Sequence, residues 1–107
     1  MITPAPDTGV IDLPGENRLV LDVDGTEAEL VYRLRGNRLV LVHTGVPDSL
    51  GGQGVGGRLV GAAIERARRE GLTIVPWCPF ARDWLSKHAD AVAEVAVDWQ
   101  SVPSAST

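Results

Sequence analysis

The residue types best suited to chemistry lie in one loop and the helix that follows it, within residues 43–71. Glycine fills five of the seven positions from 51 to 57, and Gln53 and Val55 fill the other two. Because glycine has no Cβ, the backbone N–H groups of such a loop can approach a ligand closely. A helix beginning at Val55 would add unpaired N–H groups and the positive end of its dipole. The stretch therefore predicts a site for a phosphate or a pyrophosphate.

Two well-known phosphate loops fit this stretch poorly. A nucleotide triphosphatase loop needs Lys followed by Ser or Thr after its last glycine, whereas here Arg58 follows Gly57. The dinucleotide pattern is matched in part by Gly52, Gly54 and Gly57, but the next strand, 72–75, has no acidic residue at its tip. Both readings are therefore disfavoured.

Three single side chains are candidates for a chemical role, and each has a plainer explanation. Cys78 precedes Pro79 and is expected to be the N-cap of a second helix, which would suit a nucleophile, although a small buried residue is equally compatible. His43, near a strand end, is a candidate base or orienting group, or a packed histidine. Arg58 is a candidate phosphate contact, or a solvated residue on the helix face. His88 is expected to cap the second helix.

The elements that would position these residues follow from hydrophobic periodicity. Alternation and turn signals at Asp24-Gly25 and Gly36-Asn37 predict an antiparallel meander. Residues 39–42 are apolar without alternation, which indicates a central strand covered on both faces. A helix between this strand and the next predicts that the two strands run parallel. The expected strands are 17–23, 27–34, 38–46 and 72–75, and the expected helix is 55–70. Residues 90–100 fit either a short helix or a strand.

Length and composition limit the class of protein. A chain of 107 residues accommodates one domain, which we place at 17–100 between a flexible leader, 1–16, and a polar tail, 101–107. The net charge of −4 argues against nucleic-acid binding, and no apolar run is long enough to span a membrane. Two histidines and one cysteine without regular spacing predict no metal site. The lone cysteine favours the cytoplasm.

Four sequence motifs together resemble those of a known family. They are His43-Thr44-x-Val46-Pro47, the loop 51–56, Val75-Pro76-x-Cys78-Pro79-Phe80, and Trp84-Leu85-x-x-His88. The loop is similar to the Arg/Gln-x-x-Gly-x-Gly/Ala loop by which GNAT-superfamily acetyltransferases hold coenzyme A. The four motifs, over residues 17–90, occur in the same order as in the small Yjdj-type N-acetyltransferases, which the chain therefore resembles. The resemblance implies a minimal GNAT fold of class α/β: a mixed sheet, antiparallel at first and then with a parallel strand pair, and helices on both faces.

The resemblance also implies a reaction and a set of site residues. Acetyl-coenzyme A would donate an acetyl group to an amine on a small molecule or peptide, with Cys78 and His43 as the catalytic candidates. The expected state is a monomer or a weak homodimer. The implied cofactor-binding residues are Val46, Gly51, Gly52, Gln53, Gly54, Val55, Gly56, Gly57 and Arg58.

The chain departs from the family pattern at three positions. Gly51 stands where the loop usually has Arg or Gln, Gly45 where the first motif often has Glu, and Ala89 where the last histidine is usually followed by Pro. The missing Glu leaves the general base without an assigned residue. An alternative function is therefore a non-catalytic module that binds coenzyme A or its acyl thioesters, as a sensor or a partner subunit.

Overall fold

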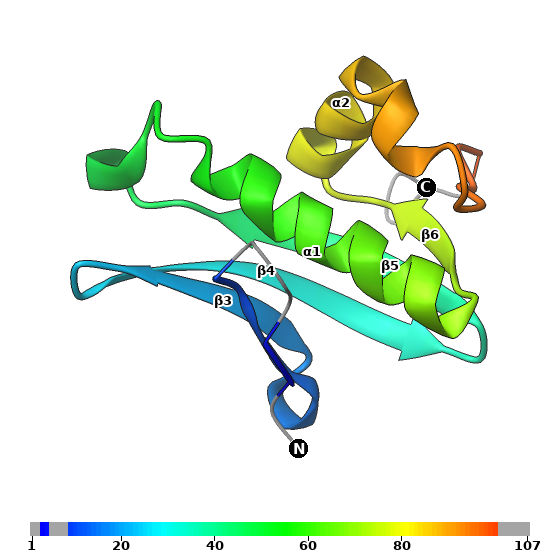
Figure 1. Cartoon of the computed structure of the whole chain (residues 1–107), viewed down its shortest axis with the longest axis horizontal. Coiled ribbons are helices and arrows are strands. Elements are labelled where there is room, and N and C mark those ends of the chain that lie inside the picture. The colour runs from blue at the N-terminus through cyan, green and yellow to red at the C-terminus, as the bar shows by residue number, and fades with distance from the viewer. Residues whose placement is uncertain (1–2, 5–8, 101–107) are drawn as a thin grey trace, which may run out of the picture.

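The fold is a six-stranded mixed sheet with two main helices, seen in a computed structural model that describes residues 3–4 and 9–100 (Figure 1). The strands lie side by side in chain order, and only β5 and β6 are parallel. The strands are β1 (Thr3–Pro4), β2 (Ile11–Leu13), β3 (Arg18–Val23), β4 (Thr26–Arg35), β5 (Arg38–Gly45) and β6 (Thr73–Pro76), and the helices are α1 (Val55–Glu70) and α2 (Pro79–Lys87). The predicted mixed sheet with an antiparallel meander and one parallel pair is confirmed.

Local sequence explains the turns and the ends of the helices. Asp24 and Gly25 both have positive φ, of 51° and 87°, as a tight two-residue hairpin between β3 and β4 requires. Helix α1 has the bounds predicted from the sequence, and Gly71 ends it in the left-handed conformation with φ 67°, its N–H donating to the carbonyl of Ala67. The parallel pair β5–β6 is joined through α1, as the sequence predicts.

The core lies between α1 and one face of the sheet. Alternate strand residues enter it, because successive side chains of a strand point to opposite faces. These include Leu19 and Leu21 of β3, Leu30 and Tyr32 of β4, and Leu39 and Leu41 of β5, packed against Leu59, Val60, Ala63, Ile64 and Ala67 of α1.

Helix α2 lies on the same side of the sheet as α1, so the expectation of helices on both faces is wrong. Ala81 and Leu85 of α2 belong to the same hydrophobic core as the residues of α1, and the start of α1 touches α2 directly. The physical reason lies in the topology. The chain passes from β5 through α1 to β6, and then from β6 through α2 to Val97, which bridges to Ile74 of β6. Both steps move in the same direction across the sheet. Two successive right-handed crossovers then place both helices on one face.

The N-terminal segment is part of the sheet, which corrects the prediction of a flexible leader at 1–16 for the described residues. Strand β2 pairs with β3, and Val10 is fully buried. Asp12 of β2 accepts hydrogen bonds from the Tyr32 hydroxyl at 2.6 Å and from Arg66 of α1 at 2.8 Å. In the sequence, strand β2 is only a short apolar run between polar residues, and this pattern is too weak to predict a strand. Residues 1–2 and 5–8 lie outside the described part.

Arg66 is the one charged residue buried in the described core. The periodicity of residues 55–70 predicts instead that it lies on the solvated face of the helix. Besides Asp12, its guanidinium donates to the Tyr32 hydroxyl at 2.6 Å and to Glu70 at 3.1 Å. Burial, followed by the hydrogen bond to Asp12, raises the pKa of Tyr32 to about 12. The phenol therefore stays protonated and can donate to the carboxylate at neutral pH.

The C-terminal residues contain both of the structures that their pattern allowed. A short 3₁₀ helix covers Ala89–Val92, and Val97 then forms a parallel bridge with Ile74 of β6. The predicted tail, 101–107, lies outside the described residues. Within the described part of the chain, no helix combines the length and hydrophobicity that crossing a bilayer would need.

Candidate functional site

Strands β5 and β6 separate at the end of the sheet that faces the glycine loop. Their pairing stops at Leu41 and Pro76, and the N–H groups of Trp77 and Cys78 both donate to the carbonyl of Leu41, at 3.0 and 2.9 Å. In the same region Val42 has no partner on β4, because Leu41 pairs with Tyr32 and His43 with Val31. Such a bulge bends a strand. Beyond Leu41, β5 stays paired with β4 on one side, and no described strand pairs with its other side.

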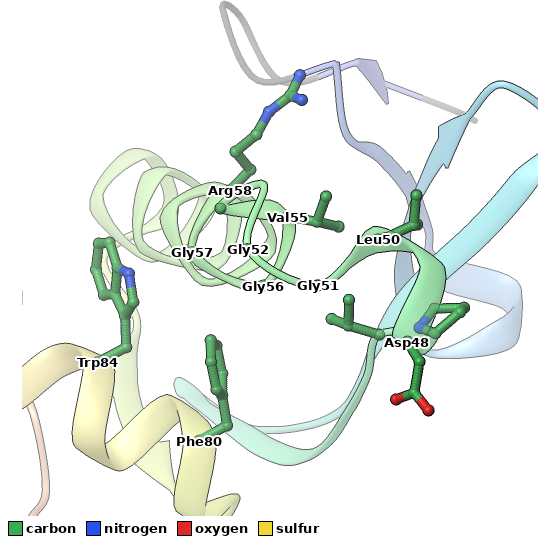
Figure 2. Close-up of a pocket in the computed structure, with 13 residues that line it drawn as sticks. Asp48, Leu50, Gly51, Gly52, Val55, Gly56, Gly57, Arg58, Phe80 and Trp84 are labelled. Carbon is green, nitrogen blue, oxygen red and sulfur yellow. The ribbon is translucent and has the colours of Figure 1, made fainter.

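A cavity of about 650 Å³ lies next to this opening, between the glycine loop, the start of α1 and α2 (Figure 2). A volume of this size is in the range of small-molecule and cofactor sites. Its wall comes from three segments: 46–52 after β5, 54–58 at the start of α1, and two rings of α2. The lining residues are Val46, Pro47, Asp48, Leu50, Gly51, Gly52, Gly54, Val55, Gly56, Gly57, Arg58, Phe80 and Trp84.

The backbone N–H groups at the start of α1 are uncapped. Gly54 is the N-cap residue and has a left-handed backbone, with φ 71°. Because glycine has no side chain, it provides no side-chain cap to the first turn. Within the described residues, no acceptor is found for the amides of residues 52–57, whereas Arg58 N–H donates to the Gly54 carbonyl at 3.1 Å. Because Val55, Gly56 and Gly57 line the cavity, donors and a helix dipole face a space of cofactor size.

Two of the glycines make room for aromatic rings of α2. A Cβ on Gly56 would lie 2.5 Å from Phe80 Cζ, and one on Gly57 would lie 2.6 Å from Trp84 Nε1. Figure 2 shows both rings directed toward the start of α1. Trp84 is also stacked on His88, with ring centroids 3.9 Å apart, and the two rings of α2 thus form an apolar wall beside the amides.

Cys78 is the N-cap residue of α2, as predicted, and its thiol is buried. Its Sγ lies 3.2 Å from Thr44 Oγ1, a hydrogen bond that links the two strands beyond their last pairing. The residue is 4% exposed and is not among those that line the cavity. The thiol is therefore buried between β5 and the start of α2 and is not exposed to the cavity.

Three other predicted site residues do not direct their polar groups into the cavity. His43 is exposed on the opposite face of β5 from Thr44, because neighbouring residues of a strand alternate. Gln53 is directed to the Ser49 carbonyl, at 3.4 Å. Arg58 lines the cavity with part of its side chain, but its guanidinium extends toward Gly9, where a Cβ would lie 3.0 Å from Nη2 (Figure 2). The structure thus brings together the loop amides and Val46, and it leaves His43 on the other face.

Sequence reasoning missed the aromatic wall and the thiol's partner. Phe80, Trp84 and Thr44 enter the sequence analysis only as members of the family motifs. The spacing of four residues between Phe80 and Trp84 placed both rings on one helix face, but the surface that this face meets is decided by the packing of α1 on α2. Among the described residues, no group of three or more His, Cys, Asp and Glu side chains is arranged to hold a metal ion.

Comparison with known proteins places the chain beside one family model and one solved structure in particular. Residues 18–95 match the family model for GCN5-related N-acetyltransferases. The fold is similar to the solution NMR structure of a GCN5-like candidate N-acetyltransferase from Staphylococcus aureus. The two share 33% sequence identity over 89% of this chain and 95% of the other, with a TM-score of 0.65.

Proposed function

This chain belongs to the family of GCN5-related N-acetyltransferases, and on that premise we propose that it transfers the acetyl group of acetyl-coenzyme A to an amine. The observation that carries the proposal is the set of unpaired amides at residues 55–57 facing a cavity of about 650 Å³. These amides and the dipole of α1 would bind the diphosphate of the cofactor. Phe80 and Trp84 supply the apolar wall beside it.

The path of the acyl arm follows from where the strands separate. Val46 lines the cavity and lies directly after β5, whose backbone beyond Leu41 has no strand on the β6 side. Backbone N–H and C=O groups there would align the arm of the cofactor. An N–H close to the thioester carbonyl would stabilise the oxyanion that forms when the amine attacks.

We expect replacement of Gly54 by valine to abolish measurable binding of acetyl-coenzyme A. The residue has φ 71°, a conformation that a β-branched side chain rarely adopts, so the loop must change its path and its amides must turn. Titration calorimetry of both proteins measures the effect. Gly25→Val is the matched control, because it also replaces a positive-φ glycine, φ 87°, but at the distant β3–β4 hairpin. Equal affinity in wild type and Gly54→Val would remove the diphosphate site from this loop.

We propose that the amine attacks the thioester directly and that Cys78 is not a nucleophile. Cys78 is 4% exposed, its Sγ is hydrogen-bonded to Thr44, and the residue does not line the cavity. In the direct route the amine nitrogen bonds to the acetyl carbon, and the carbon–sulfur bond to coenzyme A breaks. The covalent route needs a prior exchange in which Cys78 gives its proton to the departing coenzyme A thiolate.

Cys78→Ala is expected to keep the transfer rate within about threefold of wild type, because less than 1 kcal/mol of transition-state stabilisation would be lost. The measurement is release of free coenzyme A with a panel of amines, with mass spectrometry of the quenched protein. An added acetyl group on residue 78 that disappears when amine is supplied would establish the covalent route instead. If acetyl-coenzyme A binds tightly and no amine in the panel releases thiol, the protein is the non-catalytic binding module. Location in the cytoplasm and a monomer or weak homodimer remain predictions from the sequence.

A further inference from the structure

The face of β5 opposite the cavity carries a second set of reactive side chains, arranged around Gly45. A Cβ at residue 45 would lie 3.4 Å from His43 Nε2 and 3.9 Å from Glu29 Oε2. Gly45 and Glu29 are paired across β4 and β5, and His43 pairs with Val31, so the three residues share one sheet face. The bare glycine therefore leaves a small space with an imidazole on one side and a carboxylate on the other.

The charge around this space favours a cation. Glu29 Oε1 accepts a hydrogen bond from Arg18 at 3.0 Å, and Arg18 also pairs with Glu16 and Glu27, at 2.8 and 3.0 Å. Three carboxylates around one guanidinium leave a local excess of negative charge. Because Arg18 holds Oε1, the other oxygen of Glu29 remains directed toward Gly45.

The space lies next to the proposed path of the acyl arm. Gly45 directly precedes Val46, which lines the cavity, and follows Thr44, whose hydroxyl contacts the Cys78 thiol. Past Leu41 no described strand pairs with the β6 side of β5, although Cys78 still contacts β5 through Thr44. An amine at Gly45 would therefore lie one residue from the backbone that is proposed to align the acyl arm.

We propose that Gly45, His43 and Glu29 form the binding site for the acceptor, a primary amine presented as its ammonium ion; this inference rests on the proposed function. Glu29 holds the ammonium by its charge, and His43 Nε2 accepts one proton from it. The free amine then bonds to the acetyl carbon as the carbon–sulfur bond breaks. Of the two protons that the nitrogen loses, one goes to the thiolate of coenzyme A and one to solvent through His43.

The first experiment needs no cofactor, so it is independent of the proposed function. Isotope-labelled protein is titrated with spermidine and, as the uncharged probe, with a diol of similar length, and amide shifts are followed by NMR. We expect shifts centred on Gly45, Glu29 and His43 with spermidine alone. Glu29→Gln should raise the dissociation constant about tenfold, because a charge-assisted hydrogen bond is lost. Glu27→Gln is the matched control, since it also removes one carboxylate from Arg18 but does not reach Gly45.

The second experiment measures transfer from acetyl-coenzyme A to spermidine. Glu29→Gln and His43→Gln should each lower kcat/KM about tenfold or more while the affinity for acetyl-coenzyme A is unchanged, and Glu27→Gln should match wild type. Spermidine shifts spread over the surface, or wild-type transfer in both Glu29→Gln and His43→Gln, would overturn the acceptor site. Failure of acetyl-coenzyme A to bind the wild-type protein would instead overturn the proposed function, and the NMR titration would still decide the amine site.

Discussion

Asp12→Ala is expected to lower the free energy of unfolding by about 3 kcal/mol, a large share of the 5–15 kcal/mol typical of a domain this size. The carboxylate is 13% exposed and is the partner of Arg66, whose side chain is 10% exposed. Removing it leaves a buried guanidinium and the Tyr32 hydroxyl without their shared acceptor. It also removes a contact between β2 and α1, which joins residues 54 positions apart in the sequence.

Urea unfolding measures the effect, as a fall in the midpoint of roughly 2 M. Glu70→Gln is the control, because Glu70 also pairs with Arg66 but is 41% exposed, and it should cost less than about 1 kcal/mol. Equal, small effects of the two substitutions would mean that Arg66 needs no buried carboxylate. Amide exchange should also speed up at residues 10–13 in Asp12→Ala, because the local unfolding of β2 becomes easier.

Gly57→Ala and Gly61→Ala are expected to change stability in opposite directions, although both replace a glycine inside α1. A Cβ at 57 would lie 2.6 Å from Trp84 Nε1, and Trp84 cannot move freely because it is stacked on His88. Overpacking of this kind costs about 1–3 kcal/mol. At Gly61 no other described residue comes within 4 Å of the added Cβ, apart from the chain neighbours and the helix's own backbone, so the higher helix propensity of alanine should stabilise by about 0.5–1 kcal/mol.

Thermal unfolding of the two variants gives the sign of each effect, and tryptophan fluorescence reports any displacement of Trp84 in Gly57→Ala. The same displacement would reshape the cavity wall, so Gly57→Ala should also bind acetyl-coenzyme A more weakly than Gly61→Ala. A stabilised Gly57→Ala would show that Trp84 does not require the close approach.

The sequence alone determined the parts of this protein that depend on local chemistry. The bounds of α1, the turn at Asp24-Gly25, the C-cap Gly71 and the N-cap Cys78 follow from backbone preferences of single residues. The family follows from a short pattern of residues in the right order. The meander and the parallel pair follow from hydrophobic periodicity and the length of the connection.

The tertiary structure decided what depends on partners distant in the chain. Periodicity placed Arg66 in solvent, because no local signal announces that Asp12 and Tyr32 will meet it in the core. Two right-handed crossovers in one direction put α2 beside α1, and this contact alone explains why Gly56 and Gly57 face Phe80 and Trp84. The pairing of β4 with β5 likewise brings Glu29 to Gly45, across sixteen residues of sequence. Periodicity reports which face of an element is apolar, but the neighbour that covers this face is fixed only when the whole chain packs.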